Sequence, residues 1–441
     1  MGKGAGVCDK TSGIVLLSHA TDYQLPAGVE APETTIPGVG VAADRIVELL
    51  QAGEKIAVFA DYDPDGTCSA AIMKLALQDY PGQVLWGYAN SERGTGLDER
   101  FIARAHKSGC RALVSLDLGS GQPAGVQQIR RLGMEAIITD HHHPHAELQA
   151  DHHLNPQLHT PGHQASGANV AYKLGLEIGR ALHGQPQPDF INQGAWLAGF
   201  AARADLMDLD TPENSALEAL TSDPQYAPPG LLAVQQALQL KSLARSHQGR
   251  MAALLNLPKR TPLAQAAWSA GILAAKDPGE ADHYIKQLLQ VKEQCSKVQR
   301  DYLGIAWSGY QDNLGGHIAF ATIQEADSHM FAGYAGIVAL NYAKTSGHPA
   351  VVFIPQNKEG TRFKWSLRTG GADLGKQGAL SVVDHLAHIP APAGFSPAGG
   401  HAQAMGGICS GDQLGNVRQA IAEWASGLGL PMIKPQPTEK P

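Results

Sequence analysis

Up to about residue 140, the chain alternates short apolar runs with longer segments whose apolar residues recur at helical spacing. The short runs are typical of buried β-strands, and the segments between them have the length of helices that cover a sheet. Strands that alternate with helices in this way predict an α/β fold with a parallel sheet. The expected strands are 55–60, 84–88, 112–116 and 136–139, and the expected helices lie near 43–52, 69–79, 97–108 and 124–132.

The pattern changes twice along the rest of the chain. Helical spacing dominates residues 166–305, mixed α/β patterning returns from residue 316, and a Gly-rich stretch occupies 399–407. These changes predict five parts. They are an irregular lead-in at 1–41, an α/β domain at 42–222, a helical connector at 223–305, a smaller α/β domain at 306–430 and a disordered, Pro-rich tail at 431–441.

Composition narrows the classes of protein to which the chain can belong. No stretch approaches the roughly 20 uninterrupted apolar residues that a membrane span needs, and the N-terminus does not have the charged-then-apolar pattern of a signal peptide. The five cysteines lie far apart and form no CxxC pair, which argues against a disulfide framework and fits a reducing compartment. We therefore expect a cytoplasmic protein with no membrane partner.

The net charge of −7 by itself argues against a nucleic-acid partner, because phosphate binding relies on Lys and Arg. The charge is, however, unevenly distributed. Residues 241–300 carry ten basic and four acidic side chains, a local net charge of +6, so the other 381 residues carry −13. Regional charge governs electrostatic binding, and this basic segment offers a place for phosphates.

The chemistry concentrates where three of the predicted strands end. The first strand is followed by three aspartates at alternate positions, the third by one aspartate among glycines, and the fourth by an aspartate and three adjacent histidines. Because ligands bind at the carboxyl ends of parallel strands, we expect these groups to lie together. Clustered carboxylates are costly unless a cation neutralises them, and imidazole suits manganese, zinc or iron. The residues are Asp61, Asp63, Asp65, Asp117, Asp140, His141, His142 and His143, with Asp205 late in a subsequent apolar helix.

Each cluster also has a plainer interpretation when it is taken alone. The segment 61–66 could be an Asp-rich turn or a calcium loop, although the EF-hand pattern fails because its downstream Glu is missing. Asp117 could be an ordinary turn residue, and Asp205 a helix-end aspartate. Together the clusters favour two metal ions, about 3.5–4 Å apart, of the kind that hydrolyse phosphoesters or phosphoanhydrides. The Asp/His mixture favours manganese over magnesium, and the lack of nearby Cys argues against structural zinc.

In this order and spacing, the clusters resemble the four motifs of the DHH phosphoesterase superfamily. Further stretches resemble its RecJ-like branch of single-strand-specific exonucleases, and the resemblance covers roughly residues 42–410. It implies a DHH catalytic domain at 42–222 and a DHH-associated, substrate-binding domain at 306–430. The further stretches are 53–58, 94–97, 155–156 and 167–174, a Ser-x-Arg-Thr element at 366–369 and a Gly-Gly-His element at 399–401.

The resemblance also implies which side chains hold the metals. Asp63 and Asp65 would ligate different metal ions, and Asp117 would bridge the two. His141 and Asp205 would complete one of the two sites.

Other residues would act around the metals and on the substrate. Asp61 would ligate a metal or orient a water, His142 would donate to the scissile phosphate or the leaving group, and Asp140 would orient the histidines. In the second domain, a bidentate Arg and backbone N–H groups exposed by glycines would hold the nucleotide end. Those residues are Arg368, Gly399, Gly400 and His401, although the two glycines alone would also suit a tight turn.

The chain departs from the family pattern at three places. Phe59 stands two residues before Asp61, where many family members carry a His. An Asn-Ala-x-Gly-Arg element, whose Arg approaches the DNA backbone, has no clean match here, and 258–260 is the nearest basic element. The chain also ends soon after the Gly-Gly-His element, without the OB-fold of full-length bacterial RecJ, which favours a shorter substrate or a partner protein.

We therefore expect a manganese-dependent phosphodiesterase that uses two Mn²⁺ ions, or Mg²⁺ in their place, and degrades single-stranded nucleic acid, DNA above all, from an end. One alternative is a DHH phosphodiesterase of short oligonucleotides or cyclic dinucleotides. Another is a catalytically weak RecJ-like scaffold with a partner protein in a replication or repair assembly. The remaining clustered histidines match no motif, and most of them are expected in surface loops: His143, His145, His152, His153, His159 and His163.

Overall fold

The computed structural model describes residues 14–15, 24–31, 35–92, 96–308, 317–324, 327–370, 378–389, 399–401 and 404–429. The chain divides into two compact units. Unit 1 comprises Met1–Pro258 and Ala264–Leu289, and unit 2 comprises Lys259–Leu263 and Gln290–Pro441. The expected lead-in at 1–41 lies partly, and the expected tail at 431–441 wholly, outside the described residues. No helix in the described ranges is long and apolar enough to cross a membrane.

Unit 1 is built on a five-stranded parallel sheet with the strand order β4-β3-β5-β6-β7, which confirms the predicted α/β class. The four predicted strands are present to within two residues. The fifth strand, β7, contains His152 and His153, so these two histidines do not lie in a surface loop. This short segment lacks the apolar alternation that would predict a strand, and its pairing with β6 holds it extended. The bounds are β3 Lys55–Ala60, β4 Val84–Tyr88, β5 Cys110–Leu116, β6 Glu135–Thr139 and β7 His152–Leu154.

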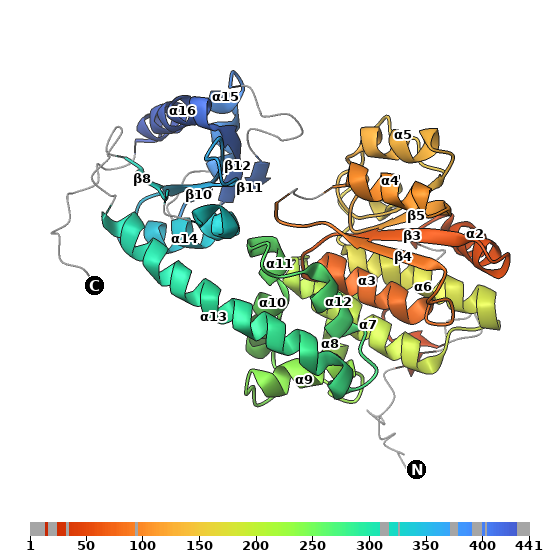
Figure 1. The fold of residues 1–441 in the computed structure, drawn as a ribbon. Helices are drawn as coiled ribbons and strands as arrows, with labels where there is room; N and C mark the ends of the chain where they lie inside the picture. The colour runs from red at the N-terminus through yellow and green to blue at the C-terminus, as the bar shows by residue number, and fades with distance from the viewer. Residues whose placement is uncertain are drawn as a thin grey trace, which may run out of the picture. The chain divides into compact units, whose positions relative to one another are not determined.

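Helices cover both faces of this sheet (Figure 1). On one face, Ala57 and Phe59 of β3 share an apolar cluster with Phe101 and Ile102 of α4 and with residues of α5. On the other face lie α3 and α6, and α2 and α7 pack against α6. The alternation of strand side chains between the two faces therefore builds two apolar layers. The bounds are α2 Val39–Gln51, α3 Pro64–Ala76, α4 Glu99–Lys107, α5 Pro123–Arg131, α6 Gly167–His183 and α7 Pro188–Ala204.

Helices continue through the segment expected as a connector. Of the predicted range 223–305, α9, α10 and α12 fall in unit 1, and the C-terminal part of α13 falls in unit 2. The predicted boundaries between the parts remain predictions. The bounds are α8 Pro212–Leu220, α9 Pro229–Ala237, α10 Arg245–Leu255, α11 Leu257–Arg260, α12 Ala266–Leu273 and α13 Pro278–Ser308, and a two-stranded sheet of β1 Ile14–Val15 and β2 Leu25–Pro26 precedes them.

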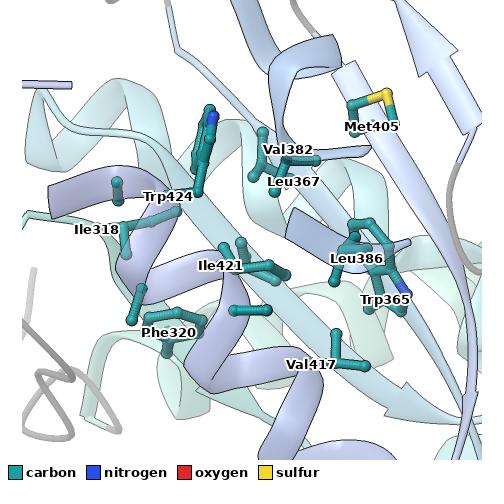
Figure 2. Close-up of a cluster of buried hydrophobic side chains, with 14 of the residues drawn as sticks. Ile318, Phe320, Trp365, Leu367, Val382, Leu386, Met405, Val417, Ile421 and Trp424 are labelled. Atoms are coloured by element: carbon teal, nitrogen blue, oxygen red, sulfur yellow. The ribbon is translucent and has the colours of Figure 1, made fainter. Parts of the chain in front are cut away.

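Unit 2 contains a second five-stranded sheet with the order β11-β12-β10-β9-β8, in which β8 and β9 are parallel and the other pairs antiparallel. Along its central strand, Phe363, Trp365 and Leu367 are buried on one face, where α15 and α16 supply Val382 and Ile421 to the same core (Figure 2). The bounds are β8 Ala319–Thr322, β9 Ala350–Pro355, β10 Arg362–Arg368, β11 Gly399–His401, β12 Ala404–Ser410, α14 Ala335–Ser346, α15 Val382–Leu386 and α16 Leu414–Gly427.

Candidate metal centre

The first acidic cluster lies where β3 turns into α3. Asp61 is buried, and its backbone N–H donates to the carbonyl of Leu116 at the end of β5 (3.1 Å). Asp63 is the N-cap of α3, and its Oδ1 accepts hydrogen bonds from the backbone N–H groups of Asp65 and Gly66, both at 3.1 Å. Capping satisfies N–H groups that the start of a helix leaves without partners, so α3 holds Asp63 at the sheet edge.

Asp65 is held by the start of a different helix. Its Oδ2 accepts from the N–H of Gly167 (2.7 Å) and its Oδ1 from the N–H of Ala168 (2.8 Å), at the beginning of α6. Burial raises the pKa of the Asp65 carboxyl, the imidazole of His141 lowers it, and Asp63 raises it again. The positive end of the α6 dipole compensates part of this buried charge, so α6 fixes the cluster from a segment about a hundred residues away.

Asp117 follows β5 in an unusual backbone conformation. Its φ of 62° lies in the left-handed region, which is costly for a residue with a Cβ. Its N–H donates to the carbonyl of Thr139 at the end of β6 (2.9 Å). Burial raises the pKa of Asp117 well above its ordinary value, and the nearby carboxylates of Asp65 and Asp63 raise it further. Backbone strain beside a charge cluster of this kind points to a functional position.

Asp140 binds the histidine pair that follows it. Its Oδ1 accepts from the backbone N–H groups of His141 (2.7 Å) and His142 (3.1 Å) and lies 2.7 Å from Nδ1 of His142. Its Oδ2 accepts from the N–H of Ser120 (2.8 Å). Burial alone would raise the pKa of Asp140, but the hydrogen bond from His142 and its charge bring it below the ordinary value. Conversely, the hydrogen bond to Asp140 raises the pKa of His142 to about 9.

His141 is the centre of the cluster. Its Nε2 lies 3.3 Å from Oδ1 of Asp117, 3.6 Å from Oδ2 of Asp65 and 3.6 Å from Oδ2 of Asp205. Asp205 comes from the C-cap of α7, as a helix-end aspartate, and its side chain is partly exposed. One imidazole thus faces carboxylates that come from three separate segments.

The structure brings seven of the eight predicted catalytic and metal residues of unit 1 into groups in which potential ligand atoms lie within 4.8 Å of one another. Asp140, the eighth, supports the histidines. Asp117 belongs to two of the groups, and His141 also belongs to two. The groups are Asp61 with Asp63 and Asp117; Asp65 with His141 and Asp205; and Asp117 with His141 and His142.

These residues fit a divalent cation. Oδ1 of Asp117 and Nε2 of His141 are buried, and neither atom has a hydrogen-bond partner among the described residues. A buried carboxylate oxygen and an imidazole nitrogen without donors or acceptors are costly, and a cation would satisfy both. It would also offset the carboxylate repulsion that raises the pKa of Asp117. Mixed oxygen and imidazole ligands suit manganese or iron, and zinc also binds such a set.

Phe59 offers no ligand to this cluster. It is 1% exposed and lies against Phe101 of α4, with ring centroids 4.8 Å apart. The position where the family resemblance expects a His is therefore part of the apolar layer under α4.

Sequence reasoning missed the hydrogen-bonding residues behind the histidines. Asn155 donates from its side-chain amide to the carbonyl of His142 (2.8 Å), and Gln157 donates to the carbonyl of His141. His153 lies with Nε2 2.8 Å from Oγ of Ser120. Asn155 was visible in the sequence as part of the resemblance at 155–156, but nothing local indicated its contact or that of His153.

The predicted substrate residues lie in unit 2. Nη1 of Arg368 donates to Oγ of Ser366 (2.6 Å) and to the carbonyl of Leu367 (2.8 Å). On the same face of β10, burial and then the charges of Lys259 and Arg368 lower the pKa of Lys364 to about 8. No carboxylate among the described residues forms an ion pair with Arg368 or Lys364, so this face of β10 is cationic. Gly399, Gly400 and His401 form β11 beside β12, and the side chain of His401 lies outside the described part.

Comparison with known proteins finds a family match, related sequences and a related fold. Residues 55–195 match the DHH family, N-terminal domain. A single-stranded-DNA-specific exonuclease RecJ from Bacillus subtilis is 25% identical over 407 residues, which cover 88% of this chain and 48% of the relative. The RecJ of the same description from Escherichia coli is 32% identical over 160 residues, which cover 35% of this chain and 28% of the relative. This chain thus spans about half or less of the length of these relatives.

A solved structure described as exonuclease RecJ bound to manganese has the same fold. Its TM-score is 0.69 at 22% identity, and the match covers 89% of this chain and 95% of that one. At this identity the likeness establishes the fold alone. The family match over residues 55–195 agrees with a DHH domain there, and it covers the first three of the four motifs, whereas Asp205 lies beyond it.

Proposed function

The chain carries a DHH-family domain at residues 55–195, and from this premise we propose that it is a metal-dependent phosphodiesterase that degrades single-stranded nucleic acid, DNA above all, from an end. The observation that carries the proposal is the position of His141, whose Nε2 lies within 3.6 Å of carboxylate oxygens of Asp65, Asp117 and Asp205. Relatives that match this chain are described as single-stranded-DNA-specific exonucleases, which supports the choice of substrate.

Two Mn²⁺ ions, with Mg²⁺ as the alternative, would be held at the sheet edge. Asp61, Asp63 and Asp117 would hold one ion. Asp65, His141 and Asp205 would hold the other, and Asp117 would be shared between the two. When bound, such cations lower the pKa of water and neutralise the charge that develops on a phosphoryl group. The manganese in a RecJ structure of the same fold supports this choice of metal.

Other side chains would donate a proton to the substrate and bind its phosphate. Asp140 holds Nδ1 of His142, and this hydrogen bond raises the pKa of the imidazole and so favours its protonated form. Its Nε2–H would donate to a phosphate oxygen or to the leaving group, as a general acid does. Arg368, the backbone of Gly399 and Gly400, and His401 would hold a phosphate of the nucleotide end.

One observation favours an alternative, a catalytically weak scaffold that serves a partner protein in replication or repair. Phe59 is built into the apolar layer under α4, so the metal group next to Asp61 has no imidazole from β3. A site with fewer ligands would bind its ion less tightly and could lose activity while keeping the fold.

The experiment that tests the proposal uses the purified full chain and single strands labelled at either end. We expect Mn²⁺-dependent release of short products from single-stranded DNA, no cleavage of a blunt duplex, and loss of activity in EDTA. Parallel reactions with RNA and with a dinucleotide assign the sugar preference and the substrate length. Cleavage of the dinucleotide alone would replace the polymer proposal with the short-oligonucleotide alternative. No cleavage of any substrate in Mn²⁺ would overturn the enzymatic proposal in favour of the scaffold.

Replacing Arg368 with Ala should weaken substrate binding more than chemistry. A hydrogen bond to a charged group contributes about 1.5–3 kcal/mol, so we expect KM to rise about 10- to 100-fold with a smaller change in kcat. Steady-state kinetics on an end-labelled single strand measure both constants. Lys358→Ala removes a positive charge from an exposed loop of the same unit and should leave both constants unchanged. An unchanged KM in Arg368→Ala would remove Arg368 from the substrate site.

A further inference from the structure

A closed set of hydrogen bonds lies behind the histidines and includes no proposed metal ligand. Asp140 accepts from the N–H of Ser120 through Oδ2 (2.8 Å) and faces Nδ1 of His142 through Oδ1 (2.7 Å). The amide of Asn155 donates to Oγ of Ser120 (2.9 Å) and to the carbonyl of His142 (2.8 Å). These four residues form a ring that joins the loops after β5, β6 and β7.

The ring is shielded from water. Ser120 and Asn155 are 0% exposed and Asp140 is 1% exposed, whereas the side chain of His142 is 58% exposed. Hydrogen bonds in such a buried setting are stronger than in water, and a partner left unsatisfied there is costly. The exposed imidazole of His142 therefore depends on these rigid, buried hydrogen bonds for its orientation.

His153 of the edge strand β7 adds a further hydrogen bond to this buried network. Its Nε2 lies 2.8 Å from Oγ of Ser120, which also accepts from Asn155. Among the described hydrogen bonds, Nε2 of His153 is the acceptor available to the Ser120 hydroxyl proton, and that role needs a neutral imidazole with its proton on Nδ1. Burial lowers the pKa of His153, in agreement with that state. An aliphatic residue at 153 would leave the hydroxyl without its acceptor.

We propose that Ser120, Asn155 and His153 are positioning residues that, through Asp140, hold the imidazole of His142 in the orientation needed to donate to the substrate phosphate. The inference rests on the proposed phosphodiesterase function. It adds to that function a layer of three residues, of which His153 comes from a strand that the sequence did not predict. Loss of a hydrogen-bond partner that orients a metal-bound histidine typically costs roughly 10- to 100-fold in metal affinity or activity, and we expect an effect of similar size on His142.

Three variants of β7 test the proposal by kinetics. His153→Leu removes the acceptor, His153→Gln restores an acceptor near the place of Nε2, and His152→Leu is the matched control on the opposite face of the strand. We expect His153→Leu to lower kcat about 10-fold or more with KM and Mn²⁺ affinity within about twofold, and His153→Gln to recover most of the loss. His152→Leu should match the wild type.

A second readout does not need activity. In the metal-free protein, the Nδ1–H of His142 in its hydrogen bond to Asp140 should give a low-field proton resonance, and Ser120→Ala and Asn155→Ala should shift or broaden it. If the wild type hydrolyses nothing, the proposed function fails, and this resonance still decides the positioning role. The inference is overturned if His153→Leu keeps the wild-type kcat and if the resonance is unchanged in Ser120→Ala and Asn155→Ala. The inference is also overturned if His153→Leu has the wild-type kcat at temperatures well below its melting temperature and loses rate only near it. In that case His153 would only stabilise the fold.

Discussion

Replacing Asp117 with Asn is expected to abolish Mn²⁺-dependent hydrolysis while leaving the fold intact. Asp117 belongs to two of the three ligand groups, so loss of its charge affects both proposed metal positions. Changes behind a metal ligand already cost about 10- to 100-fold, and a shared ligand should cost more than about 100-fold in activity. Asn tolerates the left-handed conformation that Asp117 adopts at φ 62°, so the backbone should not change. End-labelled single strands measure the rate, and titration calorimetry with Mn²⁺ measures the affinity.

The same substitution should raise the melting temperature of the metal-free protein. The pKa of Asp117 is raised by burial and by neighbouring carboxylates, which means that its ionised form is unfavourable in the folded state. A neutral amide removes that repulsion at neutral pH. Adding Mn²⁺ should stabilise the wild type more than the variant, because the cation binds the folded wild type more tightly. The exposed Asp189→Asn serves as control. A variant that keeps wild-type activity and Mn²⁺ affinity would show that Asp117 is no metal ligand.

Replacing Gly167 with Ala should damage the site from a residue that carries no functional group. A Cβ at this position would lie 2.4 Å from Oδ1 and 2.6 Å from Cβ of Asp117, closer than atoms can approach. Either Asp117 turns away or the start of α6 retreats, which breaks the hydrogen bond from the Gly167 N–H to Asp65 (2.7 Å). In both cases ligand atoms leave the group around His141. We expect Mn²⁺ affinity and kcat to fall about 10- to 100-fold or more.

Gly249→Ala provides the matched control for this prediction. Gly249 lies within α10, and a Cβ there would meet no atom within 4 Å. Alanine in place of an exposed helical glycine should stabilise the protein by roughly 0.5–1 kcal/mol with no effect on activity. Wild-type Mn²⁺ affinity in Gly167→Ala would show that the edge of the sheet can absorb an added methyl group, and that the close approach has no functional role.

The chain's own pattern was sufficient to predict β3, β4, β5 and β6 and the order of the motifs that follow three of them. Apolar runs such as 55–60 are local signals, because burial on both faces of a parallel strand requires continuous apolar side chains. The rule that strand ends meet at one edge then predicts that Asp61, Asp117 and Asp140 lie together. Asp205 followed from the resemblance, since a lone aspartate at a helix end has no distinguishing local pattern.

The supporting structure of the site could not be predicted in the same way. His152 and His153 have no apolar alternation, so β7 depends on pairing with β6 and is invisible to periodicity. The sequence shows that residue 59 is Phe but not where its side chain lies. Only its packing on Phe101 shows that it belongs to the core. The left-handed φ of Asp117 depends on contacts with the end of β6.

The sequence by itself determined the α/β class of unit 1 and the positions of the acidic and histidine side chains after its strands, because local periodicity and residue chemistry encode these. Tertiary structure alone decided that His141 faces three carboxylates from separate segments, that α6 begins against Asp65 and Asp117, and that His153 reaches Ser120. The physical reason is distance along the chain. Each of these contacts joins residues that are 24 to 103 positions apart, and such contacts form only when the sheet and its helices have packed.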